Sequence, residues 1–242
     1  MAAAWIGFAA GVFAALVSAI VAIRQAQANQ RLERLKTDLS AELHRREARI
    51  DQEFRAEDVL ARYREPLAVA AFDLQSRLYN ILRLDFLGKF GGTHARSEVA
   101  LRTTLFRLAQ YFGWTEILRR DIQFLSFPEA EHTRQVANLQ SDIAREFLRD
   151  DYGPAMMIWA DEQRAIGELM IVEEHGRILS MGFAAFERRC DELFTPWLDQ
   201  LRAELPQTEA TKRLRQIQHL LCTLVETLDV HRVRYEQELE RA

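Results

Sequence analysis

The 22 residues from Ala2 to Ile23 contain no charged side chain, and this stretch constrains the chain more than any other. Apart from Trp5, Ser18 is the only residue in it whose side chain can form a hydrogen bond. At about 1.5 Å per residue, a helix of this length is roughly 33 Å long, close to the ~30 Å hydrocarbon core of a bilayer. The sequence therefore predicts a transmembrane helix over residues 2–23, with the lipid bilayer as its surroundings.

A cleavable signal peptide is the alternative interpretation, because Ala26-Gln27-Ala28 has the A-x-A pattern of a cleavage site. Three features favour the anchor instead. No basic residue precedes Trp5, the apolar run exceeds the usual length of about 7 to 15 residues, and Arg24 interrupts it before the cleavage pattern.

The orientation of this predicted anchor follows from its flanks. Arg24, Arg31, Arg34 and Lys36 all lie on its C-terminal side. Because basic residues concentrate on the cytoplasmic side of a membrane, we expect a single-pass protein of the cell membrane with its C-terminal domain in the cytoplasm.

Small residues recur every four positions along the predicted anchor, at Ala3, Gly7, Gly11, Ala15 and Ala19, and Gly7 and Gly11 form a GxxxG pair. A ridge of this kind lets two helix backbones approach closely enough for dense van der Waals contact in lipid. It predicts a parallel homo-oligomer, most simply a dimer. The alternative is a ridge that faces lipid and has no packing role.

Between Val12 and Glu65 there is neither glycine nor proline, which predicts one long helix and makes residues 24–65 a helical stalk. Apolar residues recur there at an 11-residue interval, in the series Leu32, Leu43, Phe54 and the series Leu39, Ile50. Eleven residues in three turns is typical of a nearly straight coiled coil. The repeat is incomplete, since Arg46 follows Leu35 by 11 residues, and a solvated helix remains the alternative to pairing.

Pro66 is expected to open a new helix, and we place the start of the main domain there, over residues 66–242. Apolar residues at helical spacing predict an all-α bundle with a helix stop at Gly113, a helix start at Thr195-Pro196, and a loop over residues 176–180. The last helix is expected to begin after Thr208 and carries the strongest heptad, formed by Leu214, Ile217, Leu221, Leu224, Leu228, His231 and Tyr235. No segment shows the alternation of a strand.

Motifs of chemistry are absent or incomplete. The glycines of residues 88–93 fit neither a P-loop nor a dinucleotide-binding pattern, and the chain has no GxSxG or HExxH. Glu129 with His132, and His219 with Cys222, are each at most half of a metal site. The sequence therefore predicts no catalytic, cofactor-binding or metal-binding residues and no cofactor. It also predicts that Cys190 and Cys222 are reduced thiols with a structural role.

The net charge of −4 comes without a basic face, so nucleic acid is not an expected partner. Three segments resemble parts of uncharacterised bacterial membrane-anchored all-helical proteins. They are RYREPLAVAAFDLQSRLYNIL at 62–82, YFGWTEILRRDIQFL at 111–125 and EQRAIGELM at 162–170. The resemblance covers about one fifth of the chain and implies no activity, site residue or partner.

These features together favour an anchored interaction or scaffold protein without catalytic activity of its own, which self-associates through anchor and stalk or binds a protein partner through its C-terminal domain. The alternative is a membrane-bound enzyme or small-ligand sensor with a pocket between the helices of residues 66–242. Trp114, Tyr152 and Trp159 are the aromatic residues expected to line such a pocket.

Overall fold

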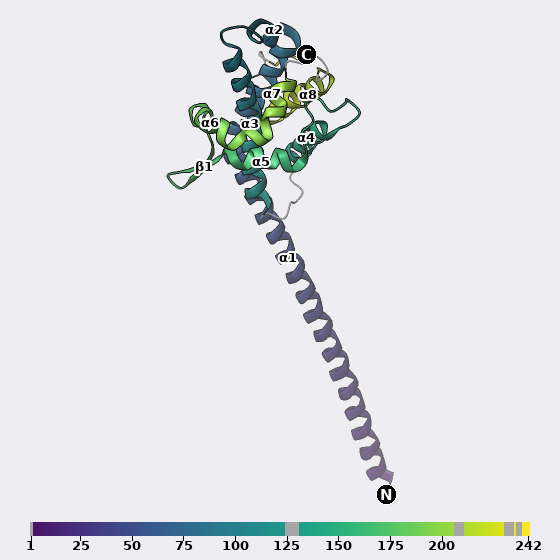
Figure 1. The fold of residues 1–242 in the computed structure, drawn as a ribbon. Helices are drawn as coiled ribbons and strands as arrows, with labels where there is room; N and C mark the ends of the chain where they lie inside the picture. The colour runs from purple at the N-terminus through teal and green to yellow at the C-terminus, as the bar shows by residue number, and fades with distance from the viewer. Residues whose placement is uncertain (1, 124–130, 206–210, 230–234, 236–238) are drawn as a thin grey trace. The chain divides into compact units, whose positions relative to one another are not determined.

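The computed structural model describes the backbone of residues 2–123, 131–205, 211–229, 235 and 239–242. Within the helices, the side chains of residues 2–23, 26, 28–29, 52–53, 55–59, 122–123 and 131 lie outside this description. The described chain is mostly helical, as the sequence predicts (Figure 1). Contacts divide it into two compact units, residues 1–51 and residues 52–242.

Helix α1 (Ala2–Leu84) supplies all the described structure of the first unit and the first helix of the second. The second unit continues with α2 (Phe86–Phe90), α3 (Ser97–Gln123), α4 (Glu131–Leu148) and α5 (Ala160–Met170). A hairpin of β1 (Ile171–Glu174) and β2 (Arg177–Ser180) follows, then α6 (Phe183–Arg189), a π-helical turn η1 (Cys190–Phe194), α7 (Thr195–Glu204) and α8 (Thr211–Leu228).

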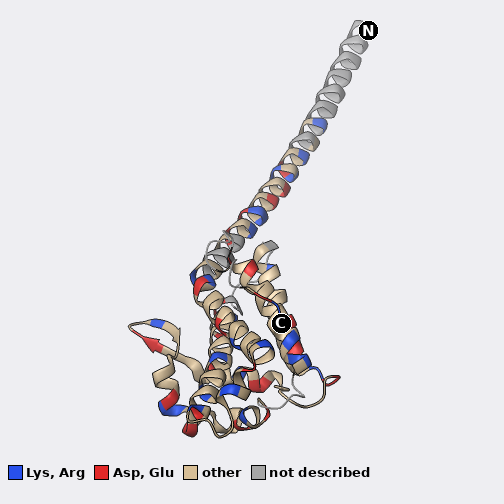
Figure 2. Ribbon diagram, turned by 90° about the horizontal axis from the view of Figure 1, so that it is seen from above, with Lys and Arg blue, Asp and Glu red and all other residues tan. Residues whose placement is uncertain are grey.

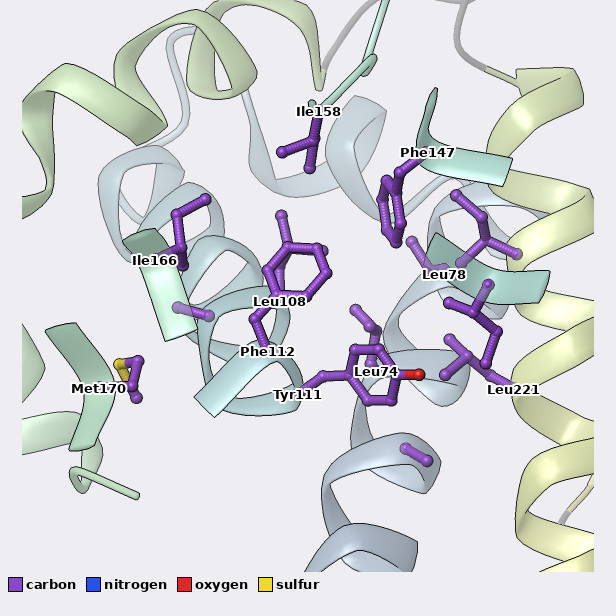
Figure 3. Close-up of a cluster of buried hydrophobic side chains, with 14 of the residues drawn as sticks. Leu74, Leu78, Leu108, Tyr111, Phe112, Phe147, Ile158, Ile166, Met170 and Leu221 are labelled. Carbon is purple, nitrogen blue, oxygen red and sulfur yellow. The ribbon is translucent and has the colours of Figure 1, made fainter. Parts of the chain in front are cut away.

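The core of the second unit lies where α1, α3, α4, α5 and α8 meet (Figure 3). Leu74 of α1, Tyr111 of α3 and Leu221 of α8 are each at least 98% buried, and the rings of Phe112 and Phe147 are 5.3 Å apart. Full burial of a leucine contributes about 1.5–3 kcal/mol. The apolar stripes predicted from sequence therefore do form one shared core.

Pro66 does not open a new helix, because α1 continues through it. The compact unit begins at Gln52 rather than at Pro66. A proline inside a helix removes one hydrogen bond and costs about 3 kcal/mol. Burial on both sides of it offsets that cost: Leu60 and Leu67 are at most 1% exposed, and the Tyr63 hydroxyl donates to Asp121 Oδ2 at 2.5 Å.

Gly113 does not end a helix either, since α3 continues to Gln123. This glycine lies where α3 crosses α5 and β2, and a Cβ atom there would lie 2.8 Å from both the Met170 Cβ and the Ser180 Oγ. On the facing helix, a Cβ at Gly167 would lie 2.7 Å from the carbonyl oxygen of Phe112. The two glycines allow close contact between helices, which local sequence cannot distinguish from a stop signal.

The expected loop over residues 176–180 and the absence of strands are both wrong. Strands β1 and β2 pair in an antiparallel hairpin, with Val172 opposite Leu179. Its two-residue turn, His175 and Gly176, has positive φ angles of 52° and 74°, the combination of a type I′ hairpin turn. Glycine adopts this conformation without strain, and the strands are too short, at four residues each, to show a clear alternation.

Two helix ends also differ from expectation. Helix α7 does begin at Thr195, with Pro196 in its first turn, but it is not separated from α6, because η1 joins the two without a break. Helix α8 ends at Leu228, so Tyr235 is not on it, and His231 lies outside the described residues. The heptad leucines up to Leu228 are at most 3% exposed, so the part of the pattern that is helical does face the core.

Candidate functional site: an exposed apolar row on α1

Six large apolar residues are exposed in a row along α1, although the second unit buries most side chains of this kind. Their exposed fractions lie between 49% and 68%, and they are Leu32, Leu35, Leu39, Leu43, Ile50 and Phe54. The first five of these residues belong to the first unit, and Phe54 belongs to the second, which begins at Gln52 on the same helix. A helix needs no such row for its own folding, so the row is a candidate interaction surface.

The spacing of the row places it on one face of the helix. Successive members, with Arg46 in the gap before Ile50, are three, four and four residues apart, twice over. At about 100° per residue, the six apolar residues fall within an arc of about 100°. This is the width of a face that packs against one other helix.

Basic and acidic residues are interspersed along the part of α1 that carries the row (Figure 2). The described pairs are local and exposed, such as Lys36 Nζ with Glu33 Oε1 at 3.5 Å and Arg46 Nε with Glu42 Oε1 at 3.3 Å. Exposed pairs of this type contribute at most about 0.5 kcal/mol each. The apolar row remains exposed beside these pairs.

The five small residues predicted to pack in the membrane, Ala3, Gly7, Gly11, Ala15 and Ala19, have helical backbone within α1. Their side chains lie outside the described residues. Among the helices that could be assessed, which excludes residues 2–23, none is sufficiently long and apolar to cross a membrane.

A small apolar pocket lies between α1, α3 and α8 in the second unit. Leu74, Leu105, Phe147 and Leu214 are among its lining residues, and Thr104 is the polar one. It has room for little more than one water molecule. This pocket gives the enzyme or sensor alternative no support, because a small-molecule site needs several hundred Å³ and convergent polar groups.

The three aromatic residues expected around a ligand do not converge on this pocket. Trp114 packs beside Tyr63, with ring centroids 6.3 Å apart, and Trp159 is 62% exposed at the start of α5. The ring of Tyr152 lies under Lys212, whose Nζ is 4.6 Å from the ring centroid. Each therefore has a separate local environment.

The two histidines of the incomplete metal motifs contact backbone carbonyls, and Glu129 lies outside the described residues. His132 Nε2 lies 2.9 Å from the carbonyl oxygen of Thr227, and His219 Nε2 lies 2.8 Å from that of Ala242. Cys190 and Cys222 are both free and buried, and burial raises the pKa of the Cys222 thiol to about 11. Within the described part of the chain, no group of three or more metal-ligating side chains comes together.

Among the residues whose side chains are described, Arg213 is the most deeply buried charged one, with no exposed surface, and sequence reasoning gave no signal for it. Its guanidinium donates at 2.5–3.1 Å to the backbone carbonyls of Glu146, Phe147, Arg149, Gly153 and Ala155. The last carbonyls of a helix have no donor within the helix, so Arg213 closes the C-terminal end of α4 and holds the following loop against α8. This arrangement is structural, because the guanidinium is used entirely within the fold.

Glu116 of α3 is only 3% exposed and is held by two arginines. Arg119 Nε and Arg120 Nε donate to its two carboxylate oxygens, each at 2.7 Å. Burial alone raises the pKa of Glu116, but the hydrogen bonds from the two arginines outweigh burial and leave the pKa below its ordinary value. The carboxylate is therefore a stable anion with both oxygens engaged, unlike a general acid or base.

Comparisons with known proteins add no relative to this description. No family model matches the chain, no curated protein matches it, and no solved structure matches its fold.

Proposed function

We propose that this protein is a single-pass membrane protein that acts as a helical interaction or scaffold protein without catalytic activity of its own. Residues 2–23 are the transmembrane helix, residues 24–65 form a stalk, and the helical bundle lies in the cytoplasm. Two copies associate in parallel through the anchor and through the apolar row of the stalk.

The observation that carries this proposal is the exposed row from Leu32 to Phe54. Burial of a leucine side chain stabilises an assembly by about 1.5–3 kcal/mol, so six half-exposed members leave several kcal/mol unrealised in a single copy. The three-four-four spacing permits each member to face its own copy across a parallel, nearly straight pair. The uncharged run before the row supports the anchor, since it would hold two stalks side by side in the same orientation.

Cysteine cross-linking in membranes tests the stalk. Single cysteines at Leu39 and Leu43 should form disulfides between chains, whereas cysteines at Ala41 and Ala48, about 140–180° away around the helix, should not. The native thiols are buried, so the unmodified protein gives the background. Equal cross-linking at all four positions, or none at Leu39 and Leu43, would show that the row does not pair with its copy.

The anchor is tested separately in a membrane association reporter. Gly7→Ile with Gly11→Ile should weaken self-association, because two isoleucines separate the helices at the ridge. The matched control, Ala10→Ile with Ala14→Ile, lies off the ridge and should leave association unchanged. Equal association of the two double variants would remove the ridge from the proposal.

Orientation has its own measurement. A reporter that is active only in the cytoplasm, fused after Ala242, should give signal, and external protease should not remove a tag at the same position in intact cells. Removal of the tag from outside, or a mature N-terminus at Asn29, would contradict the anchor and its orientation.

A further inference from the structure

Residues 239–242 form no helix or strand, and they contact side chains of α1 and α8 that lie at least 15 residues away in sequence. The contact surface consists of a stripe of α8, with Gln218, Cys222 and Glu226 at successive turns, and of Gln75 and Tyr79 on α1. We call this surface the tail groove.

The centre of the tail groove recognises main chain. The Gln218 side chain donates from Nε2 to the carbonyl oxygen of Glu240 at 2.6 Å and accepts at Oε1 from the backbone N–H of Ala242 at 3.1 Å. One amide thus binds the backbone on both sides of Arg241, as a neighbouring strand would. Recognition of this kind is satisfied by any extended peptide.

Gln218 is fully buried and Gln75 is 1% exposed, with Gln218 Nε2 donating to Gln75 Oε1 at 3.0 Å. If residues 239–242 leave, the Gln218 amide keeps Gln75 but loses the Glu240 carbonyl on its nitrogen and the Ala242 N–H on its oxygen. A buried polar group without a partner costs about 1–3 kcal/mol. The groove is therefore built to be occupied by a peptide backbone.

Side chains at the rim add selectivity. Arg241 donates to Glu226 Oε2 at 2.8 Å, and the Tyr79 hydroxyl donates to the carboxylate of Glu240. Further along α1, the ring of Tyr235 stacks on Phe72 with centroids 4.7 Å apart. These contacts favour an occupant that itself carries an acidic residue, a basic residue directly after it, and an aromatic residue upstream.

We propose that the tail groove is a peptide-binding site for an extended segment of a partner protein with this acidic-basic pattern, and that residues 239–242 are its resident ligand. Glu240 and Arg241 are exposed, so the resident segment is held mainly by polar contacts that a competing peptide can reproduce. This inference rests on the proposed interaction function in one respect, because it names the surface that a partner would bind. It requires neither the anchor nor the apolar row.

A charge exchange in the full-length protein tests the site. Glu226→Arg repels Arg241 and frees the groove, and Glu226 is exposed, so the variant should fold normally. The probe is a fluorescein-labelled, C-terminally amidated peptide with the sequence of residues 235–242, used as such and with glutamate in place of its arginine. By fluorescence anisotropy, the glutamate peptide should bind the variant about fivefold more tightly than it binds the wild-type protein. It should also bind the variant about fivefold more tightly than the arginine peptide does, because one exposed pair changes from repulsion to attraction.

A second substitution separates the groove from a general charge effect. Gln218→Leu, added to Glu226→Arg, should reduce the affinity for the glutamate peptide at least about tenfold, while far-UV circular dichroism verifies the fold. Binding without preference between the two peptides, binding that survives Gln218→Leu, or no binding to Glu226→Arg would each overturn the proposal. The stalk cross-links and the anchor reporter are unaffected by these outcomes, so the two proposals fail independently.

Discussion

The same spacing of one glutamate and two arginines occurs in both compact units, with opposite consequences. In the stalk, Glu42 precedes Arg45 and Arg46, and the closest nitrogen-oxygen distances are 3.8 and 3.3 Å. In α3, Glu116 precedes Arg119 and Arg120 at the same positions, and both distances are 2.7 Å. The Glu42 side chain is 51% exposed and the Glu116 side chain 3% exposed, so burial turns a loose surface pair into a fixed one.

The leucines of α1 also differ in burial between the two units. Leu39 is 62% exposed and Leu67 has no exposed surface, although they lie on one helix. Helix propensity is similar in both places, and only the second unit brings other helices against α1. A surface like that of the stalk is either covered by a separate chain or left in water, and this distinction can be measured residue by residue.

The largest contrast is expected from a charge placed in each region. Leu221→Asp buries an unpaired carboxylate in α8 and should cost at least about 4 kcal/mol of the free energy of unfolding, or prevent folding. Leu39→Asp should change the free energy of unfolding of the second unit by less than about 0.5 kcal/mol, because residue 39 lies in the first unit and is already hydrated within one copy. Urea unfolding in mild detergent, followed by circular dichroism, measures both. Similar stabilities would mean that α8 does not pack as described.

Arginine provides the next contrast. Arg213→Met leaves several buried backbone carbonyls without donors and should lower the free energy of unfolding by about 3 kcal/mol. Arg45→Met in the stalk removes an exposed pair, with Arg45 79% exposed, and should be neutral within about 0.5 kcal/mol. A neutral Arg213→Met would show that the loop after α4 has other sufficient contacts.

Two glycines of the second unit allow a comparison between a close helix contact, at Gly167, and an open position, at Gly182. Gly167→Ala places a methyl group 2.7 Å from the Phe112 carbonyl oxygen, so α5 must move from α3, at a cost of about 2 kcal/mol. At Gly182, no atom lies within 4 Å of the added Cβ atom, and Gly182→Ala should be neutral or slightly stabilising. The measurement is the thermal midpoint of the two variants beside wild type. A lower midpoint for Gly182→Ala than for Gly167→Ala would contradict the crossing geometry.

The smallest effect concerns pH. Because the pKa of Glu116 is lower in the folded protein, its ion pairs stabilise the fold above the ordinary pKa of 4.5, and this contribution is lost as pH falls through the lowered value. Glu116→Gln should therefore cost about 1 kcal/mol at neutral pH and progressively less in acid, whereas Glu42→Gln should have no effect at either pH. Unfolding curves at several pH values test this, and a constant cost of Glu116→Gln down to low pH would contradict it.

Much of the architecture could be predicted because helices bury apolar stripes whose spacing is visible in sequence. The stripes through Leu74, Leu108 and Leu221 were all located in this way, and all three are buried. The leucines of the stalk were likewise identified as a row from their spacing. Errors occurred where a local breaker signal was opposed by packing, at Pro66 and Gly113.

The sequence by itself determined most of the helices and which of their faces are apolar, since both depend on residues within one or two turns of each other. Only the tertiary structure decided which apolar faces become core, why Gly113 and Gly167 must lack a side chain, and which charged groups are buried. Arg213 and Gln218 illustrate the reason, because each is satisfied by backbone from segments at least 20 residues away. Such partners leave no periodic signal in the chain, and they exist only after the segments have packed.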